Sequence, residues 1–307
     1  MPHFADTLLE HIRAKGSPVC VGIDPVFERL PAEVRHPDDD PQDKTSCLDA
    51  IFRYVTDMLT VISPHVPVVK FQSACFERYG WDGVETYHSL IQEAKARSLL
   101  VIGDVKRGDI GISAEHYAMG CLADSPAIDD DDHASPHAAT VATYFGVDGL
   151  RPFMDAAIDQ AKGVFALVRT SNPGGDAIQC LQLADGRTVS QAVAQMVAKL
   201  GGEPQYLGAS GYSLLGAVVG ATKPADAAEL RRLMPQQIFL VPGFGAQGGG
   251  ADDVRACFKS DGAGALITAS RSVIFAYEKR PADDWMMCVE NAAVEFKQQI
   301  RTILGWS

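Results

Sequence analysis

The sequence predicts a (β/α)8 barrel, and three observations support this fold class. Eight short apolar runs recur along the 307 residues, segments with helical periodicity lie between them, and polar residues follow the C-terminal ends of most of the runs. Alternating strands and helices indicate a parallel sheet, and near-continuous apolar strands indicate a sheet that is buried on both faces. Eight such repeats favour a closed barrel over an open sheet.

The predicted elements alternate in a regular order. The strands are expected at Val19–Ile23, Val66–Phe71, Leu99–Asp104, Ala138–Val141, Val164–Val168, Leu215–Gly220, Ile238–Val241 and Ala265–Thr268. Segments with helical periodicity and few helix-breaking residues occupy Cys47–Ile62, Val84–Ser98, Val189–Leu200 and Ala225–Leu233. Residues Met1–Lys15 also follow a helical pattern, and Pro224 suits the first turn of the helix that begins beside it.

The length and composition are those of a globular protein with a large core. A chain with 47% hydrophobic residues can bury one large α/β domain or two smaller ones, and the eight repeats favour one. We expect a single barrel domain over residues 1–307, with an acidic surface insertion near 123–137. Four consecutive aspartates, Asp129–Asp132, lie in that insertion. A run of like charges is usually solvated, and a metal site there is the less favoured alternative.

Charge and hydropathy argue against several classes of partner. A formal net charge of −12 argues against a nucleic-acid partner. No run approaches the roughly 18 apolar residues of a membrane span, and the N-terminal segment lacks the apolar centre of a signal peptide, so we expect a cytoplasmic protein. The seven cysteines are scattered singly, without C-x-x-C or histidine pairing, which predicts reduced thiols and no zinc site.

Polar residues gather where the predicted strands end, which is the face on which barrels of this class build their sites. Asp24 follows the first strand, Lys70 lies near the end of the second, and three charged groups end the third. Later strands open into Arg169–Gly175, a glycine-rich stretch Gly243–Gly250, and a final pair, Ser270 and Arg271. We expect Arg169–Gly175 and Gly243–Gly250 to be loops that close over a bound ligand.

The third strand opens into a charged cluster, Asp104–Asp109, that reads DVKRGD. Side chains alternate between the two faces of a strand, so Asp104 and Lys106 share one face and Val105 points away from them. Asp109 follows on the loop, which predicts two carboxylates around one ammonium group. Nearby negative charge favours the protonated form of a lysine, so Lys106 is a candidate proton donor. The alternative is an ordinary ion pair at a strand end.

The loops after the seventh and eighth strands predict a phosphate site. Such barrels often bind phosphate there, because glycine exposes backbone N–H groups that approach the oxygens closely. Arg271 supplies a guanidinium fork that suits a phosphate dianion, and Gln247 offers an amide donor. The alternative is a flexible glycine loop beside a solvated arginine.

Five blocks of sequence together resemble the orotidine 5'-monophosphate decarboxylases, specifically their longer bacterial and mycobacterial-type branch. The resemblance covers about residues 5 to 300, and its most specific motif is D-x-K-R-x-D. In family order, the blocks are Val21–Pro25, Lys70–Gln72, Asp104–Ile110, Val241–Gly249 and Ala269–Arg271. The resemblance implies decarboxylation of orotidine 5'-monophosphate to UMP, the last step of de novo pyrimidine biosynthesis.

The resemblance also implies catalytic roles. Asp24 and Lys70 should hold the ribose hydroxyls, and Lys70 should join Asp104 and Lys106 in a charged chain. Lys106 should donate the proton to C6. Asp109 should act in the site of a neighbouring subunit, which implies a homodimer with shared active sites.

Further residues should bind the substrate. By similarity, Ile110 lines the pyrimidine pocket, Ser171 addresses the base, and Gln247 and Arg271 bind the phosphate. Ser113 is a weaker candidate, near the ribose or phosphate. The family is thought to use no metal or other cofactor, so we expect none.

Metal-free chemistry makes electrostatics the main requirement of the site. Loss of CO2 leaves an in-plane carbanion at C6 that the ring cannot delocalise well, and a positioned ammonium group can stabilise that charge.

Two alternative functions remain: a magnesium-dependent sugar-phosphate decarboxylase or epimerase of the same superfamily, and a non-catalytic barrel that binds a phosphorylated ligand. Where relatives often have Asn-Pro after the fourth strand, this chain reads Thr140–Gly146, so we expect no ligand contact there.

Overall fold

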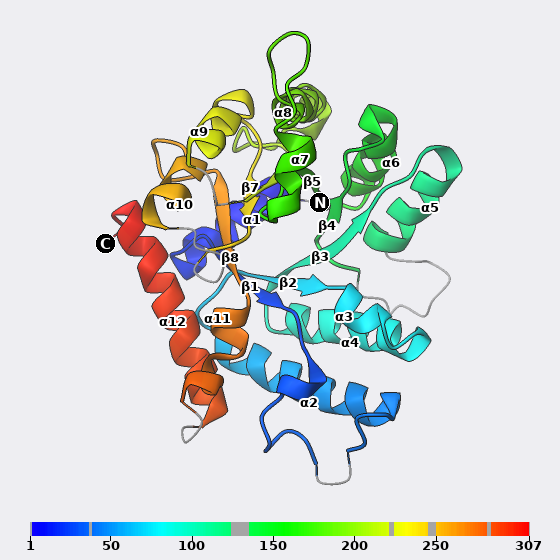
Figure 1. Cartoon of the computed structure of the whole chain (residues 1–307), viewed down its shortest axis with the longest axis vertical. Helices are drawn as coiled ribbons and strands as arrows, with labels where there is room; N and C mark the ends of the chain where they lie inside the picture. Colours follow the sequence, from blue (N-terminus) through cyan, green and yellow to red (C-terminus); the bar gives the residue numbers. More distant parts are fainter. Residues whose placement is uncertain are drawn as a thin grey trace.

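The described residues form a closed barrel of eight parallel strands with helices around it (Figure 1). The computed structural model describes residues 2–36, 39–123, 135–220, 224–244, 250–280 and 284–306. The strands are β1 (Val19–Ile23), β2 (Val68–Gln72), β3 (Leu100–Arg107), β4 (Ala138–Val141), β5 (Gly163–Arg169), β6 (Leu215–Val219), β7 (Phe239–Val241) and β8 (Ala265–Ala269). The predicted (β/α)8 fold is confirmed, with every predicted strand present.

The strands pair in sequence order, and the barrel closes between its first and last members. Cys20 of β1 pairs with Val68 of β2 on one side and with Thr268 of β8 on the other. β1 and β4 have the predicted bounds, and the other strands differ from them by at most two residues, except that β3 continues through Arg107. That extension is functionally important, because it carries Lys106 on a strand and not on a loop.

The helices cover the outside of the barrel and its N-terminal end. They are α1 (Phe4–Lys15), α2 (Lys44–Ile62), α3 (Ala74–Glu77), α4 (Trp81–Ala96), α5 (Gly111–Leu122), α6 (Gly146–Asp159), α7 (Asp176–Gln179), α8 (Val189–Gly201), α9 (Pro224–Leu233), α10 (Ala251–Cys257), α11 (Arg271–Ile274) and α12 (Trp285–Leu304). Short 3-10 turns lie at Phe27–Arg29, Pro173–Gly175, Pro204–Tyr206 and Ala276–Lys279. All the predicted helices are present.

Side-chain caps fix where several helices begin. Asp43 accepts the backbone N–H groups of Thr45 and Ser46 at the start of α2, and Thr188 forms a reciprocal capping box with Gln191 at the start of α8. Each cap satisfies amides that have no partner within the helix. The described helices include none that is long and apolar enough to cross a membrane.

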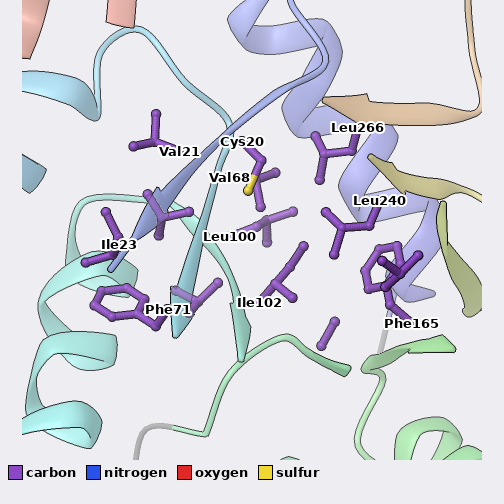
Figure 2. Packing of buried hydrophobic residues seen from close by; sticks show 14 of the residues in the cluster. Cys20, Val21, Ile23, Val68, Phe71, Leu100, Ile102, Phe165, Leu240 and Leu266 are labelled. Carbon is purple, nitrogen blue, oxygen red and sulfur yellow. The ribbon is translucent and has the colours of Figure 1, made fainter. Parts of the chain in front are cut away.

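The core lies inside the barrel and between the strands and helices (Figure 2). The residues of β1, β6 and β8 are buried throughout, as expected for a parallel sheet covered on both faces. At the N-terminal end, Phe4 of α1 packs edge-on against Phe165 and lies so close to Gly163 that any Cβ there would overlap the Phe4 ring. With this end covered, the cavity is at the C-terminal ends of the strands.

Three sequence predictions fall wholly or partly outside the described residues: the acidic insertion, the phosphate ligand Gln247 and the closing loop Gly243–Gly250. The flanks of the predicted acidic insertion, Ala123 and Ser135, are buried, while residues 124–134, which include Asp129–Asp132, lie outside the described part of the chain. Gln247 lies in residues 245–249, which are also outside it.

Candidate active site

A cavity of about 440 Å³ opens at the C-terminal ends of the strands. Residues from all eight strands, or from the segments that follow them, line it, which agrees with the prediction that polar strand ends meet at one face. Its charged and polar lining includes Asp24, Lys70, Asp104, Lys106, Ser171 and Arg271. The elements that carry them are β1, β2, β3, β5 and β8, or the residues that directly follow these strands.

The carboxylate of Asp104 joins two ammonium groups at the bottom of this cavity. Lys70 Nζ donates to Oδ2 and Lys106 Nζ donates to Oδ1, each at 2.6 Å. The side chains of Asp104 and Lys70 are each only 9% exposed, whereas that of Lys106 is 46% exposed. Asp104 therefore ties a buried cation to one that is accessible from the cavity.

Two further donors complete the hydrogen bonding of Asp104. Gln72 Nε2 donates to Oδ2 at 3.2 Å, and Thr140 Oγ1 donates to Oδ1 at 2.9 Å. Each carboxylate oxygen thus accepts two hydrogen bonds, which uses the acceptor sites available to it. The orientation of Asp104 is consequently fixed from β2, β3 and β4 at once.

The charges of the cluster stabilise its ionised form. Burial alone would favour a neutral carboxyl, but the positive charges of Lys70 and Lys106 and their hydrogen bonds lower the pKa of Asp104 to about 2. Burial would likewise disfavour the ammonium of Lys70, but the carboxylates of Asp104 and Asp24 raise the pKa of Lys70 above its usual value. Asp104 and Lys70 therefore both carry their charge at neutral pH.

Asp24 lies in the same cavity with acceptor capacity to spare. Its Oδ1 is buried and accepts no hydrogen bond from the described residues. A buried carboxylate oxygen without a partner is costly, because it has lost its hydration without replacement. The described residues therefore leave the hydrogen bonding of Asp24 incomplete at the edge of the cavity.

Ser171, which follows β5, and Arg271, which follows β8, also line the cavity. Ser171 follows β5 by two residues, and its backbone approaches Gly220 so closely that a Cβ at that position would lie 3.0 Å from Ser171 Cα. Arg271 is the first residue of α11 and its side chain is accessible.

Asp109, Ile110 and Ser113 do not line this cavity. Asp109 Oδ1 accepts the backbone N–H of Ile110 at 2.8 Å, while Ile110 and Ser113 are exposed. The expectation that Asp104 and Asp109 both flank Lys106 is therefore wrong within one chain. The reason is that β3 ends at Arg107 and the following turn directs Asp109 to the backbone of its own loop.

Thr140 was not predicted as a site residue. Residues after the fourth strand were expected to make no ligand contact, yet Thr140 lies in β4, lines the cavity and bonds to Asp104. The available signal was a polar residue inside an otherwise apolar strand. Thr268, in β8, is a similar case: it is 4% exposed and also lines the cavity.

Arg169 was expected to begin a closing loop, but it is a buried anchor. Its guanidinium donates to Asp176 and Gln179 in the segment that follows β5, and to Asp226 in α9. The side chain is only 4% exposed. Arg169 therefore fastens the segment that carries Ser171 to the neighbouring helix.

Within the described residues, no group of three or more histidine, cysteine, aspartate or glutamate side chains is arranged to hold a metal ion. The charged groups that meet in the cavity are instead two ammonium groups, a guanidinium and two carboxylates. Such a set can bind an anionic ligand, hold a hydroxyl group at Asp24 and stabilise negative charge beside Lys106.

Comparisons with known proteins agree on one family. Residues 17–282 match the family described as orotidine 5'-phosphate decarboxylase / HUMPS. An orotidine 5'-phosphate decarboxylase of Rhodopirellula baltica is 40% identical over 98% of this chain and 100% of its own length, and one of Caldicellulosiruptor bescii is 34% identical over 99% and 100%. The solved structure of an OMP decarboxylase of Leishmania donovani, 29% identical, superposes with a TM-score of 0.73 over 99% of each chain.

Proposed function

The chain belongs to the orotidine 5'-phosphate decarboxylase / HUMPS family, and from this premise we propose how its residues act. The reaction is the decarboxylation of orotidine 5'-monophosphate to UMP. The bond between C6 of the pyrimidine and its carboxylate carbon breaks, CO2 leaves, and the electron pair stays on C6. A proton then replaces the lost group.

Lys106 is the proton donor in this proposal. The main support is the Asp104 carboxylate, which holds the accessible ammonium of Lys106 at 2.6 Å on the floor of the cavity. A fixed cation beside C6 stabilises negative charge as it develops, without reorganisation at the moment of reaction. The same ammonium then donates its proton to C6 and regains one from solvent.

Asp104 and Lys70 act on Lys106 and on the substrate. Asp104 holds Lys106 in place and keeps a negative charge beside the carboxylate that leaves. Lys70 balances the charge of Asp104 and, together with Asp24, binds the ribose hydroxyls. The position of Asp24 and Lys70 together in the lining of the cavity supports this assignment, because a carboxylate and an ammonium group both bind hydroxyls.

The remaining residues bind the two ends of the nucleotide. Ser171 contacts the pyrimidine, and Arg271 binds the phosphate with the help of Gln247. The accessible guanidinium of Arg271 at the edge of the cavity supports this orientation. Binding of the remote phosphate contributes free energy that is used at the reacting carbon.

We propose further that two subunits share their active sites. Asp109 and Ile110 point away from their own cavity, and a groove between α5 and α6 begins at Ile110. Exposed apolar side chains lie on α5, on the residue before it and in the loop before α6: Ile110, Ile112, Tyr117, Met119, Tyr144 and Phe145. Such a patch is typical of a protein interface. A second subunit on this face would bring its Asp109 and Ile110 to the partner's site, with Ser113 nearby.

The assignment of Lys106 is tested by Lys106→Ala. We expect the variant to lose decarboxylation of orotidine 5'-monophosphate by at least about 1,000-fold in kcat, because its role is realised in the transition state. Its affinity for UMP, measured by calorimetry, should change far less. Equal losses of turnover and UMP affinity would show that Lys106 only binds the nucleotide.

A further inference from the structure

The pairing between β3 and β4 is interrupted beside the charged cluster. Gly103 pairs with Ala139, and the next registered pair is Arg107 with Val141. Three residues of β3, Asp104 to Lys106, therefore lie opposite one residue of β4, Thr140. Such a bulge leaves backbone groups without their ladder partners and redirects the side chains near it.

The Thr140 hydroxyl takes the place of the missing ladder contact. Its Oγ1 accepts the backbone N–H of Lys106 at 3.0 Å and donates to Asp104 Oδ1 at 2.9 Å. The side chain is only 1% exposed, so water does not compete for these bonds. One hydroxyl thus contacts the backbone of one charged residue and the carboxylate of the other.

Lys106 needs such support, because its backbone has a φ of +45°. A non-glycine residue rarely adopts a left-handed conformation, and one that does so at a functional site is held there by its surroundings. Two hydrogen bonds to β4 and the residue after it support the backbone here: one from the Lys106 amide to Thr140, and one of 2.7 Å from the amide of Ala142 to the carbonyl of Arg107. The first of these depends on a single side chain.

We propose that Thr140 is a positioning residue, whose hydroxyl holds Lys106 in its left-handed backbone conformation and Asp104 in the orientation that both lysines share. This inference rests on the proposed roles of Asp104 and Lys106. Thr140 itself transfers no proton. It acts by fixing where the Lys106 ammonium lies relative to C6.

The test compares Thr140→Val, which keeps the shape and loses the hydroxyl, with Thr140→Ser, which keeps the hydroxyl. A displacement of about 1 Å in a catalytic group can cost about 100-fold in rate, so we expect Thr140→Val to lower kcat by about 10- to 100-fold. Its UMP affinity should stay within about twofold, since the ammonium is used mainly in the transition state. Thr140→Ser should recover most of kcat.

Thr143→Val is the matched control. Thr143 also donates one hydroxyl hydrogen bond, to the carbonyl of Leu167 at 2.7 Å, but it contacts neither Asp104 nor Lys106. This variant should keep kcat within about twofold of the wild type. If Thr140→Val does not fold, Thr140→Ala provides the same comparison in a smaller side chain.

Two further readouts separate positioning from general stability. The crystal structure of Thr140→Val should show Lys106 with a changed φ or a displaced ammonium group. In the pH profile of kcat for this variant, the acidic limb should move to higher pH, because Asp104 has lost a donor that favours its charged form. An unchanged kcat, or a Ser variant as impaired as the Val variant, would overturn the inference. If the wild type itself fails to turn over the nucleotide, the proposed function is wrong, while the Lys106 geometry in Thr140→Val still tests the role of Thr140.

Discussion

Replacing Lys70 by methionine tests the buried ion pair on which the site is built. The Lys70 and Asp104 side chains are each 9% exposed, and their charged atoms lie 2.6 Å apart. Removing one partner of a buried pair costs about 3–5 kcal/mol, because the other charge stays buried. Asp104 keeps Lys106 at 2.6 Å, so the lower limit, about 3 kcal/mol, applies here. Methionine fills a similar volume, so little of the loss comes from a cavity.

The assay is unfolding by heat and by urea, with wild type and variant at the same protein concentration. A loss of about 3 kcal/mol lowers the melting temperature of a chain of this size by roughly 5 °C. Lys44→Met is the matched control, since Lys44 pairs with Asp82 on the surface, where the two side chains are 58% and 42% exposed. Breaking an exposed pair costs at most about 1 kcal/mol.

The two lysine variants must therefore differ clearly. If Lys70→Met and Lys44→Met shift the unfolding midpoints by equal amounts, the buried pair contributes no more than a surface pair. The interpretation of Lys70, Asp104 and Lys106 as a preorganised charged cluster would then be wrong.

Three more predictions concern acid stability, shared sites and the anchored segment. The pKa of Asp104 is about 2, below its unfolded value, so its contribution to stability is complete above about pH 4 and is lost as the pH falls towards 2. Urea unfolding at stepped pH should show this loss in the wild type and not in Asp104→Asn. An equal mixture of Lys106→Ala and Asp109→Ala subunits should regain about a quarter of wild-type activity, because half the dimers are mixed and each mixed dimer has one intact site of its two. No recovery of activity despite proven subunit exchange would contradict shared active sites. Arg169→Met should raise KM about tenfold with a smaller change in kcat, since the segment carrying Ser171 loses its anchor. An unchanged KM would mean that Arg169 does not position Ser171.

The barrel could be predicted because its signals are local. Each strand is an apolar run short enough to be recognised alone, and the helices between them have their own periodicity. The exception is the end of β3, where the polar residues Lys106 and Arg107 end the apolar pattern although the backbone continues to pair with β4. Helices α5, α6, α10 and α12 were not among the helical segments named from the sequence.

The site was predictable only as far as one strand determines it. Strand alternation correctly placed Asp104 and Lys106 on one face, because that depends on two residues of the same segment. The partnership of Asp104 with Thr140 depends on a bulge between two strands, and no local pattern specifies that register. Asp109 was misplaced for the same reason, since the turn after Arg107 decides where its carboxylate points.

The most direct test of the central claim is the loss of absorbance when orotidine 5'-monophosphate is added to protein treated with EDTA. We expect turnover at an undiminished rate, with UMP and CO2 as products, because Lys106 and not a metal ion stabilises the charge at C6. No turnover without metal, followed by activity on a sugar phosphate once magnesium is restored, would contradict this account. The barrel and its anion site would then serve a metal-dependent reaction.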